Sequence, residues 1–415
     1  MTGSAPRERA ASVGAPAPAA GPWLLLSLFL LSLILFAGNA SLSLAGDDVA
    51  WLHGEQGTAF DAHRVLPRLL FAGLRALFGP SAPAALATIW LLHALNGWLL
   101  YRLACRLLAG KAAPAAALAV FLLNPLTLGG LTWISCLASV PGPTFGLAAC
   151  PAARQALRGD GPPALAWAVA SLVALGLGLG SNYDLFFLPL AWVILGWLRG
   201  RLRPGLWLGA AGLALALPIG GLGWASADPG LDPWRLLSGE GALALASSGL
   251  ASVPILALAY PVSFFAAATG FLQACFSEPA RWTLTALALG VAILFYDGRR
   301  AWRTGLALVL CSVVLLAPFC ARLILTPGEG SYHPTYILSG RLYYLPSVGI
   351  ALTLGHLAGG LYRRLSPWLP PWLFWALPVA ATGHALWLYE PGDFLGLSQV
   401  AAESTAQSEA WAPFA

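Results

Sequence analysis

The chain has 415 residues, of which 58% are hydrophobic and only 9% are charged. A soluble protein carries about a quarter charged residues, so this composition excludes a soluble globular domain. The net charge of +5 at pH 7 comes from basic residues in short segments between apolar runs, and not from one solvated basic face. This distribution argues against a protein that binds nucleic acid.

The first apolar run covers residues 22–45 and follows an Ala/Pro-rich segment, residues 1–21, that contains Arg7 and Arg9. A basic segment, an apolar run and small residues also describe a secretory signal peptide. Because the apolar character continues to Ala45 and further apolar runs follow, we favour an uncleaved first membrane span. Residues 1–21 are then expected to be disordered and cytoplasmic.

Apolar runs of about 18 residues or more recur along the chain, and this length crosses a hydrocarbon core of about 30 Å. Residues 241–272 are apolar but interrupted by Pro254 and Pro261, so they predict either a helical hairpin or an interfacial segment. The sequence therefore predicts an all-α polytopic membrane protein with 11 or 13 transmembrane helices. The expected spans are 22–45, 82–101, 113–131, 134–153, 163–180, 184–198, 205–225, 281–297, 304–320, 342–361 and 367–388.

The basic residues decide the expected orientation of these spans. With the N-terminus in the cytoplasm, most arginines and Lys111 fall on inner loops, whereas most Asp and Glu residues fall on the other side. A Lys/Arg excess in cytoplasmic loops is the positive-inside rule. We therefore expect one polytopic domain over 22–389, with 46–81 as the first extracytoplasmic loop and 390–415 as an extracytoplasmic tail.

Several small or polar residues inside the spans are interpreted as packing residues. Gly176, Gly178 and Gly180 allow neighbouring helices to approach closely, since the pattern lacks the strand that a nucleotide-binding glycine loop needs. The six cysteines contain no C-x-x-C pair, so they indicate neither a disulfide framework nor a metal cluster. His93 and Asn96 stand three residues apart in one span, where they either link neighbouring helices by hydrogen bonds or line a substrate cavity.

The expected extracytoplasmic side holds most of the residues that can carry chemistry. Asp47 and Asp48 follow the first span directly, and burial at a membrane interface raises the pKa of a carboxyl group until it is a competent general base. Other outer segments add histidines, arginines and a further acid that suit an anionic substrate. For any single loop residue, ordinary charge at the membrane edge is the simpler interpretation. The outer residues singled out are His63, Arg64, Asp184, His333 and Arg341.

Several segments also stand in a recognisable order along residues 22–365. They are "GDDVAWL", "HRVL", "LLHALNGWLLYRL", "NPLTLGGLTWISCLASVPGPTFGLAA", "SNYDLFFLPL" and "GRLYYLPSVG". In this order the chain resembles the GT-C fold glycosyltransferases, and among them the protein O-mannosyltransferase-like enzymes. The resemblance implies a GT-C-like helical fold that transfers a sugar from a polyprenyl-phosphate carrier to an acceptor hydroxyl on the extracytoplasmic face.

The resemblance also implies roles for individual residues. Asp47 or Asp48 takes the position of the catalytic acid that deprotonates the acceptor. Arg64 and Arg341 take the positions of arginines that neutralise the departing lipid phosphate. No metal ligand is assigned, and a requirement for a divalent metal stays open. With the outer residues named above, the expected substrate-binding set is His63, Arg64, Asp184, His333, Arg341 and Tyr344.

The chain differs from this family in the third-helix motif. Neutral residues stand there where the family has histidine, arginine and acidic residues: Asn124, Thr127, Gly129, Leu137 and Ser139. This difference keeps a second interpretation open, a catalytically inactive GT-C-like scaffold or accessory subunit of a larger membrane complex. A transporter is disfavoured, because the spans hold almost no charge.

The expected partners follow from these two interpretations. Both need the lipid bilayer, the enzyme needs a lipid-linked sugar donor, and the accessory subunit needs further membrane chains. Abundant Ala, Gly and Arg with a single lysine, Lys111, are typical of a GC-rich bacterial genome. This composition indicates a bacterial inner membrane.

Overall fold

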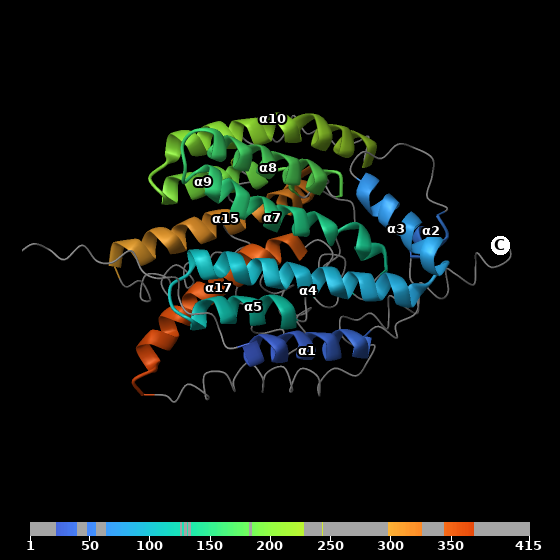
Figure 1. Cartoon of the computed structure of the whole chain (residues 1–415), viewed down its shortest axis with the longest axis horizontal. Helices are drawn as coiled ribbons and strands as arrows, with labels where there is room; N and C mark the ends of the chain where they lie inside the picture. The colour runs from blue at the N-terminus through green and yellow to red at the C-terminus, as the bar shows by residue number, and fades with distance from the viewer. Residues whose placement is uncertain are drawn as a thin grey trace, which may run out of the picture.

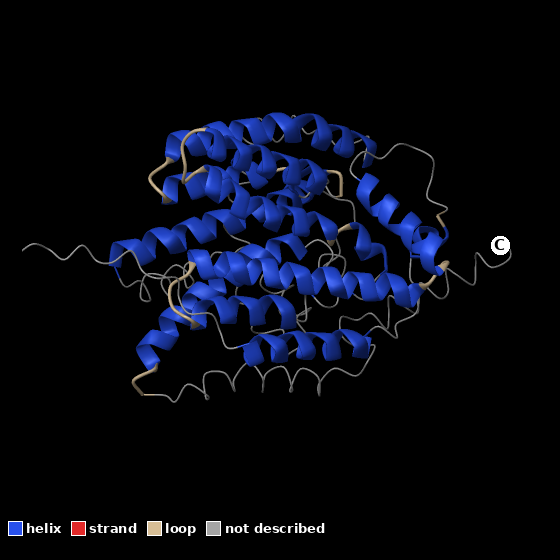
Figure 2. Cartoon of the chain, in the orientation of Figure 1, coloured by secondary structure: helices blue, strands red, loops and turns tan. Residues whose placement is uncertain are grey.

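Every regular element in the described part of the chain is helical, as the sequence predicts (Figure 2). These elements come from a computed structural model of the chain. The described residues are 22–39, 48–54, 64–124, 127, 131, 134–181, 185–227, 243, 298–325 and 344–368.

The helices follow the order of the predicted apolar runs, with two helices added in the first loop (Figure 1). Within the described residues they are α1 (Pro22–Asn39), α2 (Asp48–His53), α3 (Val65–Phe78), α4 (Ala82–Leu107), α5 (Ala112–Leu123), the 3-10 helix η2 (Ile134–Ala138), α7 (Pro141–Ala156), α8 (Pro162–Leu179), α9 (Leu188–Leu198), α10 (Leu202–Ala227), α15 (Gly298–Leu325) and α17 (Tyr344–Leu365).

Six of the described helical segments are long and apolar enough to cross a membrane. This finding supports the expected multi-pass helical membrane protein. The total number of spans stays a prediction, because 281–297, 369–388 and all of 241–272 except Leu243 lie outside the described residues. The six segments are Ala82–Leu107, Ile134–Ala156, Pro162–Leu179, Leu202–Ile219, Ala301–Pro318 and Tyr344–Leu365.

Two expected spans differ from the observed helices in their boundaries. The span expected over 113–131 ends as α5 at Leu123, so it has 12 residues and is about 18 Å long. The span expected over 134–153 starts as η2 and becomes α-helical only at Pro141. Proline suits the first helical turn, because its missing N–H would have no intrahelical partner there.

The helices lie side by side, and their basic ends gather at one end of the bundle. In Figure 1 the ends of α4, α7, α9 and α17 and the starts of α5, α8, α10 and α15 lie at the left. We call this the arginine-rich end, and it carries Arg106, Arg154, Arg158, Arg199, Arg201, Arg303, Arg363 and Arg364. Asp160 and Asp48 are the only carboxylate residues in the described part of the chain, and Asp160 lies at this end.

The centre of the bundle is built on small residues. Apart from Val120, every residue of α5 is buried, and α17 packs directly against it. A Cβ atom added at Gly355 would lie 2.6 Å from the Ala117 Cβ, and one added at Gly359 would lie 2.5 Å from the Ala113 Cβ. This small-xxx-small pairing brings the two helix backbones into close contact.

The glycine run at the end of α8 has the expected packing role in part. A Cβ at Gly178 would meet the Leu185 side chain, which confirms the close approach at that residue. At Gly176 the nearest side chain, Leu215, would be 3.7 Å away, so this glycine is not required by space.

The outer helices expose large apolar side chains. Trp23 on α1 is 78% exposed, and Leu165 on α8 and Trp207 on α10 are also exposed. These helices lie at the bottom and top of Figure 1, outside the α4–α5–α17 core. Apolar surface of this kind is expected where a bundle faces lipid.

Candidate functional site

The helices α2 and α3 contact each other at the end of the bundle opposite the arginine-rich end (Figure 1). Asp48 opens α2, and Trp51, one turn later, is only 2% exposed. The Trp51 ring stacks on Phe71 of α3, with centroids 4.9 Å apart. The Arg64 guanidinium, immediately before α3, lies 5.8 Å from the Trp51 ring centroid, within cation–π range. The Trp51 ring therefore holds α2, the helix that begins at Asp48, close to Arg64.

Arg75 fixes the other end of α2. Its Nη1 donates a hydrogen bond of 2.9 Å to the Trp51 carbonyl oxygen. Gly54 ends α2 at a φ of +80°, and a Cβ there would lie 2.9 Å from Arg75 Nη2, so glycine is needed for both backbone and space. Sequence reasoning did not single out Arg75, because nothing in its spacing points to a carbonyl 24 residues away.

Arg75→Gln is expected to loosen α2 without unfolding the bundle. A charge-assisted hydrogen bond contributes about 1.5–3 kcal/mol, so the α2 amides should exchange with solvent about tenfold faster or more. Hydrogen–deuterium exchange on a peptide covering 48–54 measures this change. Arg102→Gln is the matched control, since the Arg102 guanidinium stacks 5.2 Å from the Trp98 ring centroid on another helix. Equal exchange in the two variants would contradict the role of Arg75.

The start of α3 is tied to the end of α8. The Leu66 amide donates a hydrogen bond of 3.1 Å to the Gly180 carbonyl oxygen. Arg64 lies two residues before Leu66, and Asp184 lies four residues after Gly180. This bond holds the start of α3, which follows Arg64, beside the end of α8.

A buried polar cluster joins the start of α17 to α4. The Asn96 amide Nδ2 donates to the Tyr344 hydroxyl at 3.0 Å and to the Val140 carbonyl at 3.2 Å. The same hydroxyl is 3.0 Å from His93 Nδ1, and the His93 ring stacks on Phe121 with centroids 5.0 Å apart. His93 and Asn96 therefore link neighbouring helices, as one of the two interpretations of their spacing predicts.

These elements meet at η2, which contacts α2, α3 and α4 and ends two residues before Val140, whose carbonyl oxygen accepts from Asn96. We call this region the α2–α3–η2 corner: Asp48–His53, the start of α3 from Arg64 to Phe71, and Ile134–Ala138. Of the predicted site residues, Asp48, Arg64 and Tyr344 are described, at the start of α2, before α3 and at the start of α17. The other predicted site residues lie outside the described residues: Asp47, His63, Asp184, His333 and Arg341.

The third-helix motif lies beside this corner and is apolar in character. Asn124, Thr127 and Leu137 are fully buried, Ser139 is half-buried, and Gly129 lies outside the described residues. Within the described residues, no three His, Cys, Asp or Glu side chains come together in a way that could hold a metal ion. The corner as described therefore offers two arginines, Arg64 and Arg68, and the backbone position of one acid, Asp48.

Comparison with known proteins gives one likeness. No protein-family model matches the chain, and no curated protein matches it in sequence. Among solved structures, the chain is similar to the archaeal oligosaccharyltransferase AglB from Archaeoglobus fulgidus, in complex with an inhibitory peptide and a dolichol-phosphate. The TM-score is 0.42 at 13% sequence identity, and the alignment covers 92% of this chain and 55% of that one. The chain thus spans about half the length of that protein.

Proposed function

We propose that this chain is a membrane glycosyltransferase that moves a sugar from a polyprenyl-phosphate carrier to an acceptor hydroxyl at the α2–α3–η2 corner. The observation that supports the proposal is the pairing of the helix that starts at Asp48 with Arg64, through the buried Trp51 ring. An acid and an arginine at one membrane edge are the two groups that such a transfer needs.

The proposed reaction needs one base and one anion-binding group. Asp47 or Asp48 accepts the proton of the acceptor hydroxyl, whose oxygen forms a bond to the anomeric carbon of the sugar. The bond between that carbon and the phosphate oxygen breaks, and the phosphate leaves on its lipid. Arg64 and Arg341 neutralise the charge that develops on it, since arginine binds phosphate through bidentate hydrogen bonds.

Transfer assays test this proposal directly. Membranes that contain the chain are supplied with a panel of radiolabelled polyprenyl-phosphate sugars, and donor consumption is measured. We expect Asp47→Asn or Asp48→Asn to lower transfer about 10²-fold or more, the usual effect of losing a general base. Asp160→Asn is the control, because this carboxylate lies at the arginine-rich end, pairs with Arg201 at 3.3 Å and should not affect transfer. A wild-type chain that consumes no donor would contradict the proposal.

The proposal also fixes an orientation. By the positive-inside rule the arginine-rich end faces the cytoplasm of a bacterial inner membrane, so the corner faces the extracytoplasmic side. The N-terminus is then inside, and 390–415 lies outside.

A second candidate is a catalytically inactive scaffold within a larger membrane complex. The observation that favours it is the burial of neutral Asn124, Thr127 and Leu137 where the resembled enzymes carry charge. A scaffold would consume no donor and would co-purify with fixed partner chains, and its properties would not change in the Asp47→Asn and Asp48→Asn variants.

A further inference from the structure

The arginine-rich end contains a buried arginine whose charge nothing described compensates. Arg154, in the last turn of α7, is 7% exposed, and its buried Nε has no hydrogen-bond partner. Among the described residues, the charged groups that act on it electrostatically are Arg199, Arg158 and Arg106, all of the same sign. A buried charge without a partner is strongly unfavourable, so this arrangement favours an anion at Arg154.

The nearest described acid does not supply that anion. Asp160 is 82% exposed and is engaged with Arg201 at 3.3 Å. Arg199, which follows α9, is itself affected: burial, and then the positive charge of Arg158, lower its pKa. The described part of this end thus places several positive charges around one buried guanidinium, that of Arg154.

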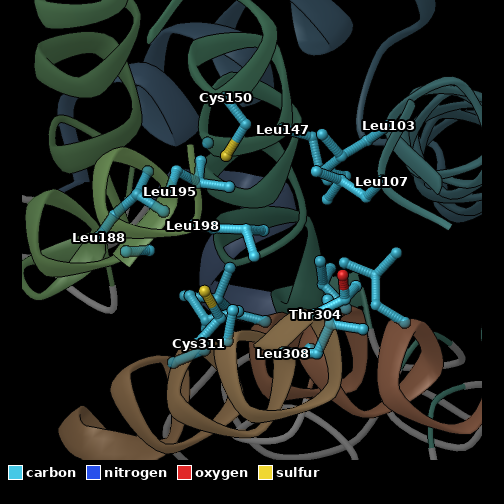
Figure 3. A pocket seen from close by; sticks show the side chains of 18 residues that line it. Leu103, Leu107, Leu147, Cys150, Leu188, Leu195, Leu198, Thr304, Leu308 and Cys311 are labelled. Atoms are coloured by element: carbon cyan, nitrogen blue, oxygen red, sulfur yellow. The ribbon is translucent and has the colours of Figure 1, made fainter. Parts of the chain in front are cut away.

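An apolar cavity lies among the helices that carry these arginines. It has a volume of about 60 Å³ and lies between α4, α7, α9, α15 and α17. Figure 3 shows Cys150 and Leu147 of α7 facing it from one side and Cys311 and Leu308 of α15 from the other. Thr304 is the one polar residue among those labelled.

The cavity and the arginine cluster are continuous along the helices. Arg154 follows Cys150 by one turn on α7, and residues four apart share a helix face. Leu107 and Leu198 line the cavity as well, and each is the chain neighbour of an arginine of the cluster, Arg106 and Arg199 respectively. A ligand at this place meets positive charge at one end and hydrocarbon at the other.

We propose that this is a binding site for an anionic lipid, with the phosphoryl group on Arg154, Arg106 and Arg199 and the adjoining hydrocarbon in the cavity. Arginine forms bidentate hydrogen bonds to phosphate, which accounts for the anion. A dry apolar cavity of about 150 Å³ holds a benzene ring, so about 60 Å³ accommodates a short length of chain next to the headgroup. The site lies at the opposite end of the bundle from the α2–α3–η2 corner and does not depend on the proposed transfer activity.

Lipid binding to the full chain tests this proposal. The purified protein is reconstituted in phosphatidylcholine vesicles with and without a minor fraction of phosphatidylglycerol, and bound lipid is counted by native mass spectrometry. We expect phosphatidylglycerol to be preferred, and Arg154→Gln to weaken this preference about tenfold or more, since it removes charge-assisted hydrogen bonds. Arg203→Gln, in the first turn of α10 and exposed, should weaken it less than about twofold. Equal losses in the two variants would mean unspecific surface attraction and would overturn the site.

Thermal stability separates a ligand site from a structural arginine. In phosphatidylcholine alone, Arg154→Gln should melt at the same temperature as the wild type or higher, because it removes an uncompensated buried charge. With phosphatidylglycerol present the order should reverse, since a ligand stabilises only the protein that binds it. If Arg154→Gln melts lower in both lipids by the same amount, the residue is structural and the proposal fails. If sodium phosphate protects the wild type as well as phosphatidylglycerol does, the site takes free phosphate and the lipid assignment is wrong.

Discussion

Gly355→Ala is expected to destabilise the folded protein by about 2–3 kcal/mol, although it adds a single methyl group. The new Cβ would lie 2.6 Å from the Ala117 Cβ, 2.7 Å from the Ala113 carbonyl oxygen and 2.9 Å from the Ala117 amide nitrogen. Two of these three atoms belong to the α5 backbone, so no side-chain rotation relieves the overlap. The helix α17 must move away from α5, and the packing of both is lost together.

Matched variants make this measurement specific. Gly73→Ala adds the same methyl group to α3, where no atom lies within 4 Å, and should stabilise by about 0.5–1 kcal/mol through helix propensity. At Gly359 the first overlap is with the Ala113 Cβ at 2.5 Å and the next is with its Cα at 3.2 Å. The double variant Gly359→Ala, Ala113→Gly should therefore recover most of the stability that Gly359→Ala alone loses. Unfolding in one detergent compares all of them, and equal midpoints for Gly355→Ala and Gly73→Ala would refute the α5–α17 packing.

Tyr344→Phe is expected to cost about 1–3 kcal/mol, because it leaves buried hydrogen-bonding groups of His93 and Asn96 without their partner. The loss is expected to be smaller when Asn96 is already leucine. A double-mutant cycle of Tyr344→Phe and Asn96→Leu should give a coupling energy of about 1 kcal/mol, within the range found for such bonds in membranes. A coupling near zero would mean that the hydroxyl and the amide do not depend on each other.

The same variant decides between two roles for Tyr344. If the hydroxyl serves only to clamp α17 to α4, Tyr344→Phe lowers the unfolding midpoint and leaves the KM for the lipid-linked donor unchanged. If the hydroxyl contacts donor, as the resemblance implies, the KM rises. Both quantities are measured on one preparation, so stability and binding are separated.

The long apolar helices of the described residues could be predicted from the sequence because apolar length identifies them, whereas the short α2 and α3 were not predicted. Where helices begin and end was less predictable: the sequence pattern runs through Ala138 without a break, whereas Pro141 starts a new α-helix after η2. In the same way, α5 ends early, before Asn124. This end was not predicted, because a single neutral residue does not interrupt the apolar pattern.

For the site, residue spacing identified hydrogen-bonding side chains on α4 but not the residues that they bind. The three-residue spacing of His93 and Asn96 predicted a helix–helix link, yet Tyr344 lies 248 residues beyond Asn96. The buried position of Trp51 and the bond from Arg75 to its carbonyl oxygen depend on tertiary contacts that no local pattern encodes. Arg154 directly follows the span expected over 134–153, and its burial becomes visible only once its four-residue spacing from Cys150 is combined with the neighbouring helices.

The short buried helix α5 has a consequence for biosynthesis. Its packing partner α17 begins at Tyr344, so more than two hundred residues must be made after Leu123 before the two can meet. At about 5–20 residues per second, the ribosome needs on the order of 10–50 s for that stretch. During this time α5 is about 18 Å long in a hydrocarbon core of about 30 Å, without the helix that later covers its alanine face. Insertion of the early helices is therefore separated in time from closure of the core, and a chaperone or the translocon has a defined nascent surface, Ala113 and Ala117, to shield in the interval.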